Sequence, residues 1–104
     1  MSAETTKLKR AILEYLRAQG CWIWNNDTIG NSGRRLSNNS RGAADLIGLT
    51  RYGTFIAVEI KAGKDKLNAD QQRHRSEILV RNGLHLEARS IEEVITFAKQ
   101  HRIF

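Results

Sequence analysis

The sequence has one cysteine and no proline among its 104 residues. A single cysteine excludes an internal disulfide, and Cys21 with three scattered histidines lacks the spacing of a zinc site. No apolar run approaches the ~20 residues that a membrane-spanning helix needs. The first residues lead into a charged amphipathic segment, which is not the pattern of a signal peptide. We therefore expect a soluble, cytoplasmic protein.

The length and the charge narrow the class further. A chain of 104 residues fits a single domain, residues 1–104, that buries roughly 65% of the surface of its unfolded chain. Lysine and arginine number 17 against 11 acids, which gives a formal charge of +6. Such a charge favours a polyanionic partner, although a solvated, lysine-rich surface would give the same total.

The periodicity predicts an α/β fold in the order helix, strand, strand, strand, helix, strand, helix. Gly20 should close the first helix, Gly83 the second, and Ser90 should open the third. The expected strands cover residues 21–26, 44–49, 54–61 and 84–88, with the second helix at 68–82. Because the third and fourth strands are joined through that helix, they should pair in parallel.

The loop at residues 51–53 sets the register of a hairpin. Three residues with Gly53 in the left-handed position suit a hairpin turn. Centring the loop on its middle residue places Leu49 opposite Phe55 and Ile47 opposite Ala57.

The same register brings charged residues together at the open end of the hairpin. Asp45 falls opposite Glu59, and Lys61 lies two residues beyond on the same face. Opposed carboxylates repel unless a positive charge lies between them, and either Lys61 or a divalent metal ion would serve. The alternative is that the strand ends fray and these residues form a surface ion cluster. Spacing alone leaves both interpretations open.

Three segments in this order resemble a known nuclease family. They are residues 42–48 (GAADLIG), 58–61 (VEIK) and 68–71 (NADQ). Together they are similar to the VRR-NUC (virus-type replication-repair nuclease) family of the PD-(D/E)XK superfamily, over about residues 4–94. The resemblance implies a restriction-endonuclease-like αβββαβ core, a mixed sheet flanked by helices, with a C-terminal helix added. The small-or-proline position before the aspartate is Ala44 here, a minor departure.

The resemblance implies roles for the matching residues. Asp45, Glu59 and the backbone carbonyl of Ile60 would bind Mg²⁺, which Mn²⁺ could replace. Lys61 would orient or deprotonate the attacking water, or stabilise charge on the phosphate. The expected reaction is hydrolysis of a DNA phosphodiester.

Two further residues have competing interpretations. Gln71 matches the glutamine that supports the lysine and the scissile phosphate, but it also completes a capping box with Asn68. Glu4 matches an acid that reaches the metal through water, and its spacing to Leu8 and Tyr15 predicts an inward position. It is also an ordinary first-turn acid that favours the helix dipole.

Basic residues around these motifs are candidates for contact with DNA phosphates, although a mobile, solvated loop is the alternative for those at 27–41. The candidates are Arg34, Arg35, Arg41, Lys64, Lys66 and Arg73. Trp22 and Trp24 suit a core or a subunit contact better than a base-stacking platform. Cys21 should be a small buried apolar residue.

The leading hypothesis is a metal-dependent endonuclease that cuts branched DNA. Short members of the family resemble Holliday-junction resolvases, act as homodimers and commonly come from phages, which would place this chain in the cytoplasm of a bacterial host. The alternatives are a flap or restriction-like nuclease with the same site, and a basic DNA-binding module without activity.

Overall fold

The seven elements follow one another in the predicted order. The computed structural model describes residues 3–26 and 42–104, so Arg34, Arg35 and Arg41 lie outside the described residues. The elements are α1 (Ala3–Ala18), β1 (Trp22–Asn25), β2 (Leu46–Leu49), β3 (Phe55–Ile60), α2 (Ala69–Val80), β4 (Leu84–Ala88) and α3 (Ile91–Gln100).

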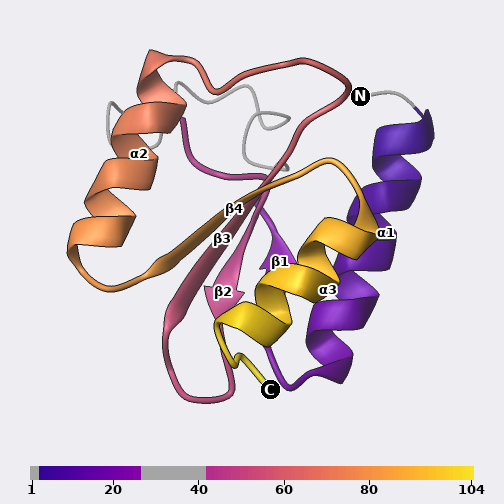
Figure 1. Ribbon diagram of the computed structural model, residues 1–104, viewed down its shortest axis with the longest axis vertical. Helices are drawn as coiled ribbons and strands as arrows, with labels where there is room; N and C mark the ends of the chain where they lie inside the picture. Colours follow the sequence, from indigo (N-terminus) through magenta and orange to yellow (C-terminus); the bar gives the residue numbers. More distant parts are fainter. Residues whose placement is uncertain (1–2, 27–41) are drawn as a thin grey trace.

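The four strands form one mixed sheet in the order β1-β2-β3-β4. The pairs β1–β2 and β2–β3 are antiparallel, whereas β3 and β4, joined through α2, are parallel. The α/β fold class is therefore confirmed, including the αβββαβ order and the additional C-terminal helix. Figure 1 shows α2 on one side of the sheet and α1 and α3 on the other.

The hairpin between β2 and β3 has the predicted register. Leu49 pairs with Phe55 and Ile47 pairs with Ala57. Gly53 adopts a left-handed conformation with φ of 83°, which a residue without a Cβ atom tolerates best. The three-residue loop thus sets the pairing on which the predicted site depends.

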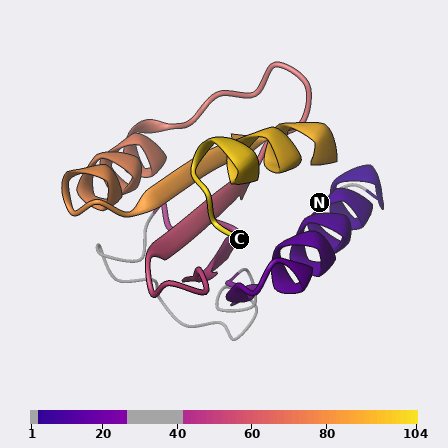
Figure 2. The ribbon, with the colours of Figure 1, turned by 60° about the horizontal axis from the view of Figure 1, so that its bottom comes forward.

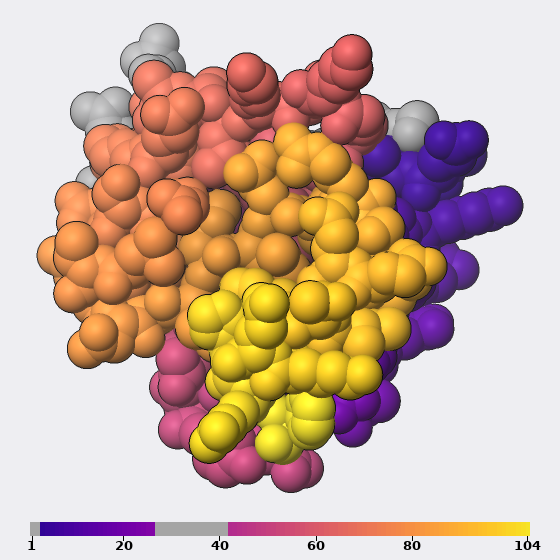
Figure 3. All heavy atoms as spheres, viewed as in Figure 1, coloured from indigo at the N-terminus to yellow at the C-terminus, as the bar shows by residue number. Residues whose placement is uncertain are grey.

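The hydrophobic core lies on the face of the sheet that α1 and α3 cover. Alternate strand residues point to this face, and apolar residues of the two helices fill it. Its largest fully buried side chains include Ile12, Leu16, Ile23, Leu46, Ile56, Val58 and Val94. Figure 2 shows α1 and α3 apart from α2. In the space-filling view of Figure 3, α3 and the C-terminal residues lie over the middle of the molecule.

The left-handed residue that ends α2 is not the expected glycine. The left-handed residue is Asn82, with φ of 65°, and not Gly83. Gly83 meets a packing requirement instead, because a Cβ atom there would lie 2.7 Å from Cγ2 of Ile78. Asparagine tolerates the left-handed region because its short polar side chain can bond locally, so the two positions have exchanged their expected roles.

The two tryptophans of β1 do not belong to the core. The exposed fraction is 70% for Trp22 and 39% for Trp24, so the interpretation as core residues is wrong. Their rings lie 5.2 Å apart. Both face away from the packed side of the sheet, on its edge strand. Cys21 is buried as predicted, and burial raises the pKa of its thiol.

None of the described helices combines the length and the apolar character needed to cross a bilayer.

Candidate active site

The Asp45 carboxylate is tied to the neighbouring strand. The β2–β3 ladder ends at the pair Leu46–Val58, so Asp45 lies one residue beyond it. Its Oδ2 atom accepts a hydrogen bond from the backbone N–H of Ile60 at 2.8 Å. The backbone carbonyl of Asp45 accepts from the N–H of Asn26 at 2.8 Å, next to the end of β1. The aspartate is therefore held against the peptide that joins Glu59 to Ile60.

Glu59 is buried near the end of β3. Only 3% of this residue is exposed, although carboxylates are rarely buried without a compensating interaction. Alternation along the strand directs it away from the core face that holds Val58 and Ile60. The strand therefore brings Glu59 and the carboxylate of Asp45 to the same region, as the hairpin register predicted.

Lys61 and Gln71 are in direct contact. The Lys61 Nζ atom donates to Oε1 of Gln71 at 2.8 Å. The same oxygen accepts from the backbone N–H of Asn68 at 3.0 Å, while Oδ1 of Asn68 accepts from the N–H of Gln71 at 2.9 Å. Gln71 therefore completes the capping box of α2 and accepts from the lysine at the same time, so the capping role does not exclude a contact with Lys61.

Gly42 joins the aspartate segment to α2. Its φ is 79°, and a Cβ atom would lie 2.3 Å from the backbone carbonyl of Asp70 and 2.6 Å from the N atom of Gln71. A contact this close between backbones is open only to glycine. The segment that leads to Asp45 thus lies directly against the helical turn that carries Gln71.

Glu4 does not occupy the expected position. It lies in the first turn of α1 and is exposed, so the prediction of an inward side chain is wrong. The buried residues of α1 are Ile12 and Leu16. Each step of four residues turns a helix by about 40° beyond a full circle, so Glu4 is displaced by about 120° from Leu16. The spacing to Leu8 and Tyr15 follows the margin of the packed face, because both are only half-buried.

The described candidates for DNA contact follow Lys61 in the chain. Lys64 and Lys66 are exposed in the loop between β3 and α2, and Arg73 is exposed two residues after Gln71. The structure therefore places these three cations in the segment that begins after Lys61.

A further charged pair near the site was missed at the level of sequence. The parallel register aligns Glu87 of β4 with Glu59, on the same face of the sheet. Arg89 Nη2 lies 3.2 Å from Oε1 of Glu87, and Arg89 also donates to the backbone carbonyls of Gly63 and Asp65. Arg89 thus fixes the loop that follows Lys61. The register of the β2–β3 hairpin does not predict the Glu87–Arg89 pair, because the position of β4 depends on the crossover through α2.

The donor chemistry fits a hard divalent cation. Asp45, Glu59 and the carbonyl of Ile60 provide oxygen atoms alone, which Mg²⁺ prefers, and Mg²⁺ usually keeps several waters besides one or two carboxylates. Within residues 3–26 and 42–104, no three acidic, histidine or cysteine side chains come together as a metal-binding group. A cation here would therefore depend on two carboxylates, one carbonyl and water.

Comparison with known proteins adds no relative. No protein-family model, no curated protein and no solved structure matches this chain. The geometry of its own residues therefore carries the functional argument.

Proposed function

We propose that this chain is a Mg²⁺-dependent DNA endonuclease. The observation that carries the proposal is the joint placement of two pairs at one end of the β2–β3 hairpin. Asp45 is bonded to the N–H of Ile60, and Lys61 is bonded to Gln71, each at 2.8 Å. The sequence order of these residues is that of the nuclease family which the chain resembles.

The residues have complementary tasks in phosphodiester hydrolysis. Asp45, Glu59 and the carbonyl of Ile60 would hold the cation. A bound divalent cation polarises a phosphoryl oxygen and lowers the pKa of a water molecule. Lys61 would face the charge that develops on the phosphate, or orient the attacking water. Gln71 limits the motion of the lysine, because its own side chain is fixed by the capping box.

The fixed position of Lys61 matters because misplaced groups lose much of their catalytic effect. A free lysine side chain samples many rotamers and loses up to ~2 kcal/mol of entropy when it is held in one. The bond to Gln71 has already restricted it before substrate binds.

Branched DNA, above all a Holliday junction cut by a homodimer, is the proposed substrate. Two copies related by a two-fold axis would present two sites to two opposed strands. The exposed tryptophans of β1 are the candidate subunit contact. A phage-encoded enzyme of this kind would act in the cytoplasm of its bacterial host.

The test is a panel of labelled four-way junction, flap, splayed and duplex DNAs, incubated with Mg²⁺ or with a chelator. We expect cleavage of the junction in preference to duplex, only with the metal. D45N and K61M should abolish cleavage, whereas K99M, an exposed lysine of α3, should cleave like the wild type. Mass determination in solution tests the dimer.

The other outcomes identify the alternatives. Preferred cutting of flaps or linear duplex would retain the chemistry and overturn the junction assignment. Absence of cleavage on every DNA with Mg²⁺ and Mn²⁺, combined with salt-sensitive binding, would favour a non-catalytic DNA-binding module.

A further inference from the structure

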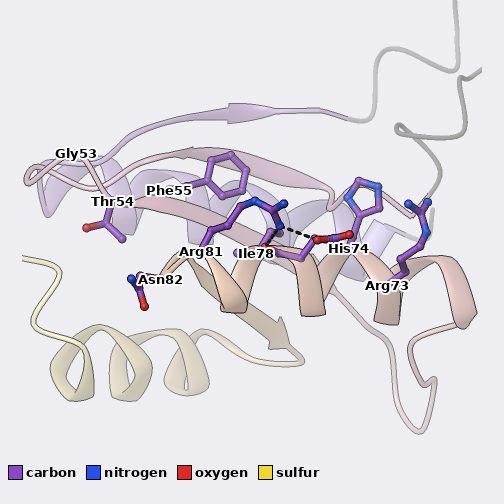
Figure 4. A pocket seen from close by; sticks show the side chains of 10 residues that line it. Gly53, Thr54, Phe55, Arg73, His74, Ile78, Arg81 and Asn82 are labelled. Atoms are coloured by element: carbon purple, nitrogen blue, oxygen red, sulfur yellow. Dashed lines mark hydrogen bonds and ion pairs between the residues drawn. The ribbon is translucent and has the colours of Figure 1, made fainter.

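A groove of about 740 Å³ lies between α2 and the start of β3. It is distinct from the cluster around Asp45 and Lys61, although it begins beside that cluster at Arg73 and His74. It continues along the helix to Asn82 and to the hairpin loop at Gly53 (Figure 4). None of the proposed roles described so far uses this groove as a whole.

The groove exists because α2 packs loosely against the sheet. None of the twelve residues of α2 is buried, and Ile78 is only half-buried. At Gly83 the chain passes close to both α2 and β3. A Cβ atom there would meet Ile78 and lie 3.5 Å from the carbonyl oxygen of Phe55. The helix therefore leaves a channel open toward its middle.

Positive charge prevails along the groove. Arg73 and Arg81 line it together with His74, and among the described lining residues Glu77 is the single acid. The pKa of Glu77 is lowered, first by its hydrogen bond to Arg81 and further by Arg81, Arg73 and His74 as charges. The carboxylate thus lies in a positive field that a phosphate would share.

The ion pair between Arg81 and Glu77 can open at small cost. Arg81 Nη1 lies 2.6 Å from Oε1 of Glu77, but the side chains are 70% and 60% exposed. Exposed pairs of this kind contribute little net stability. Arg81 is therefore available to exchange its carboxylate partner for a phosphate.

An aromatic ring faces the same groove. Phe55 lines it from β3 and is 39% exposed. Figure 4 shows the ring across from the helix, on the side where Arg81 extends. Exposed aromatic rings combined with arginines are the chemistry that binds single-stranded nucleic acids, since every base has a face that can stack.

We propose that this groove binds an unpaired DNA strand, with a base against Phe55 and phosphates against Arg73 and Arg81. The bases of a duplex are stacked on one another, so they have no free face for Phe55. Eight residues separate Arg73 from Arg81, the two arginines that line the groove, which is about 12 Å along a helix. At about 3.4 Å per nucleotide, this length accommodates roughly three to four nucleotides. That this strand belongs to a substrate leaving the Asp45–Lys61 site rests on the proposed nuclease function. The binding of an unpaired strand to the groove does not.

The first test measures the anisotropy of a labelled ten-nucleotide oligothymidine in EDTA, where no metal-dependent cleavage takes place. F55L keeps an apolar side chain but removes the stacking face. Stacking contributes ~1–3 kcal/mol per base, so the affinity of F55L for the oligothymidine should fall about 5- to 150-fold. R81A should also weaken binding. E77Q should strengthen it, because Arg81 and the field around it are released for phosphate.

Controls separate the groove from general electrostatics. K99A removes one exposed positive charge from α3 and should change affinity less than twofold. Circular dichroism checks that each variant is folded, and E77Q provides a readout in the opposite direction from loss of structure. Thymidine monophosphate and polyglutamate serve as competitors.

The result that overturns the inference is wild-type oligothymidine affinity in both F55L and R81A. Equal competition by thymidine monophosphate would replace the strand with a single nucleotide, and equal competition by polyglutamate would replace it with an acidic peptide. If F55L loses binding while no DNA is ever cleaved, strand binding in the groove is supported and the nuclease proposal is overturned. If K61M abolishes cleavage while F55L and R81A bind normally, the nuclease proposal is supported and strand binding in the groove is overturned.

Discussion

His85 makes the stability of the fold dependent on pH in a direction that can be worked out. It lies on β4 opposite Ala57 and is 9% exposed. Within the part of the chain that the structure describes, neither ring nitrogen makes a hydrogen bond. The pKa of His85 is lowered from 6.5 to about 4, mainly because the ring is buried. The charges of Arg75 and His74 on α2 contribute to this lowering, and Glu87 of β4 opposes it.

The sign and size follow from the two pKa values. Because the unfolded chain binds the proton more readily, stability contributed by neutral His85 is present above pH ~6.5 and is lost as pH falls toward 4. The difference between the unfolded and folded pKa of His85 corresponds to ~3 kcal/mol when complete, and about 2 kcal/mol of it is lost by pH 5. That is a large part of the stability of a small domain.

The assay is urea unfolding of the wild type and of H85L at pH 7.5 and pH 5. Carboxylates titrate in both proteins, so the difference between their two pH dependences isolates the histidine. We expect H85L to lose about 2 kcal/mol less than the wild type over this interval. H101Q, at an exposed histidine, should behave as the wild type. Identical pH dependences in H85L and wild type, or an NMR titration midpoint of His85 above pH 6, would refute the reasoning.

Three further predictions concern Gly48, Gly42 and Gln71, the glutamine of the α2 capping box. G48A should destabilise the fold by about 3 kcal/mol in urea unfolding, because its Cβ would lie 2.1 Å from the carbonyl oxygen of Trp22; a loss below 1 kcal/mol would contradict the close strand contact. G42A should reduce DNA cleavage at saturating Mg²⁺ by displacing the first turn of α2, whereas G53A, equally left-handed but with open space around its Cβ, should cost only ~1 kcal/mol of stability and leave cleavage unchanged. Q71A should lower kcat more than KM and expose the first backbone amides of α2 to faster hydrogen exchange, and unchanged kcat would show that Lys61 needs no partner.

Much of the fold followed from local rules. Turn chemistry at Gly53 and alternation along the strands predicted the hairpin register, because a three-residue loop leaves few alternatives. The register then predicted that Asp45 and Glu59 approach each other. Tertiary packing was required for the rest. Asn82 takes the left-handed position because Gly83 is needed where the chain meets Ile78.

The candidate site shows the same division. Asp45, Lys61 and Gln71 could be named from motif spacing, and the structure brings the last two into contact. Glu4 was misplaced, since a four-residue spacing drifts around the helix and both edges of an apolar stripe look alike in sequence. The sequence gives no indication of the groove beside Phe55, because an exposed and a buried phenylalanine in a strand have the same sequence pattern.

The double use of Gln71 links the catalytic proposal to local motion. Its Oε1 atom accepts from the first turn of α2 and from Lys61 at once. Helix ends open and close with low free energies, often far below that of global unfolding. Each time this turn frays, the lysine loses its partner as well. The fraction of molecules with Lys61 held in place therefore cannot exceed the fraction in which the capping box is closed, and temperature or a mutation at Asn68 would change both together.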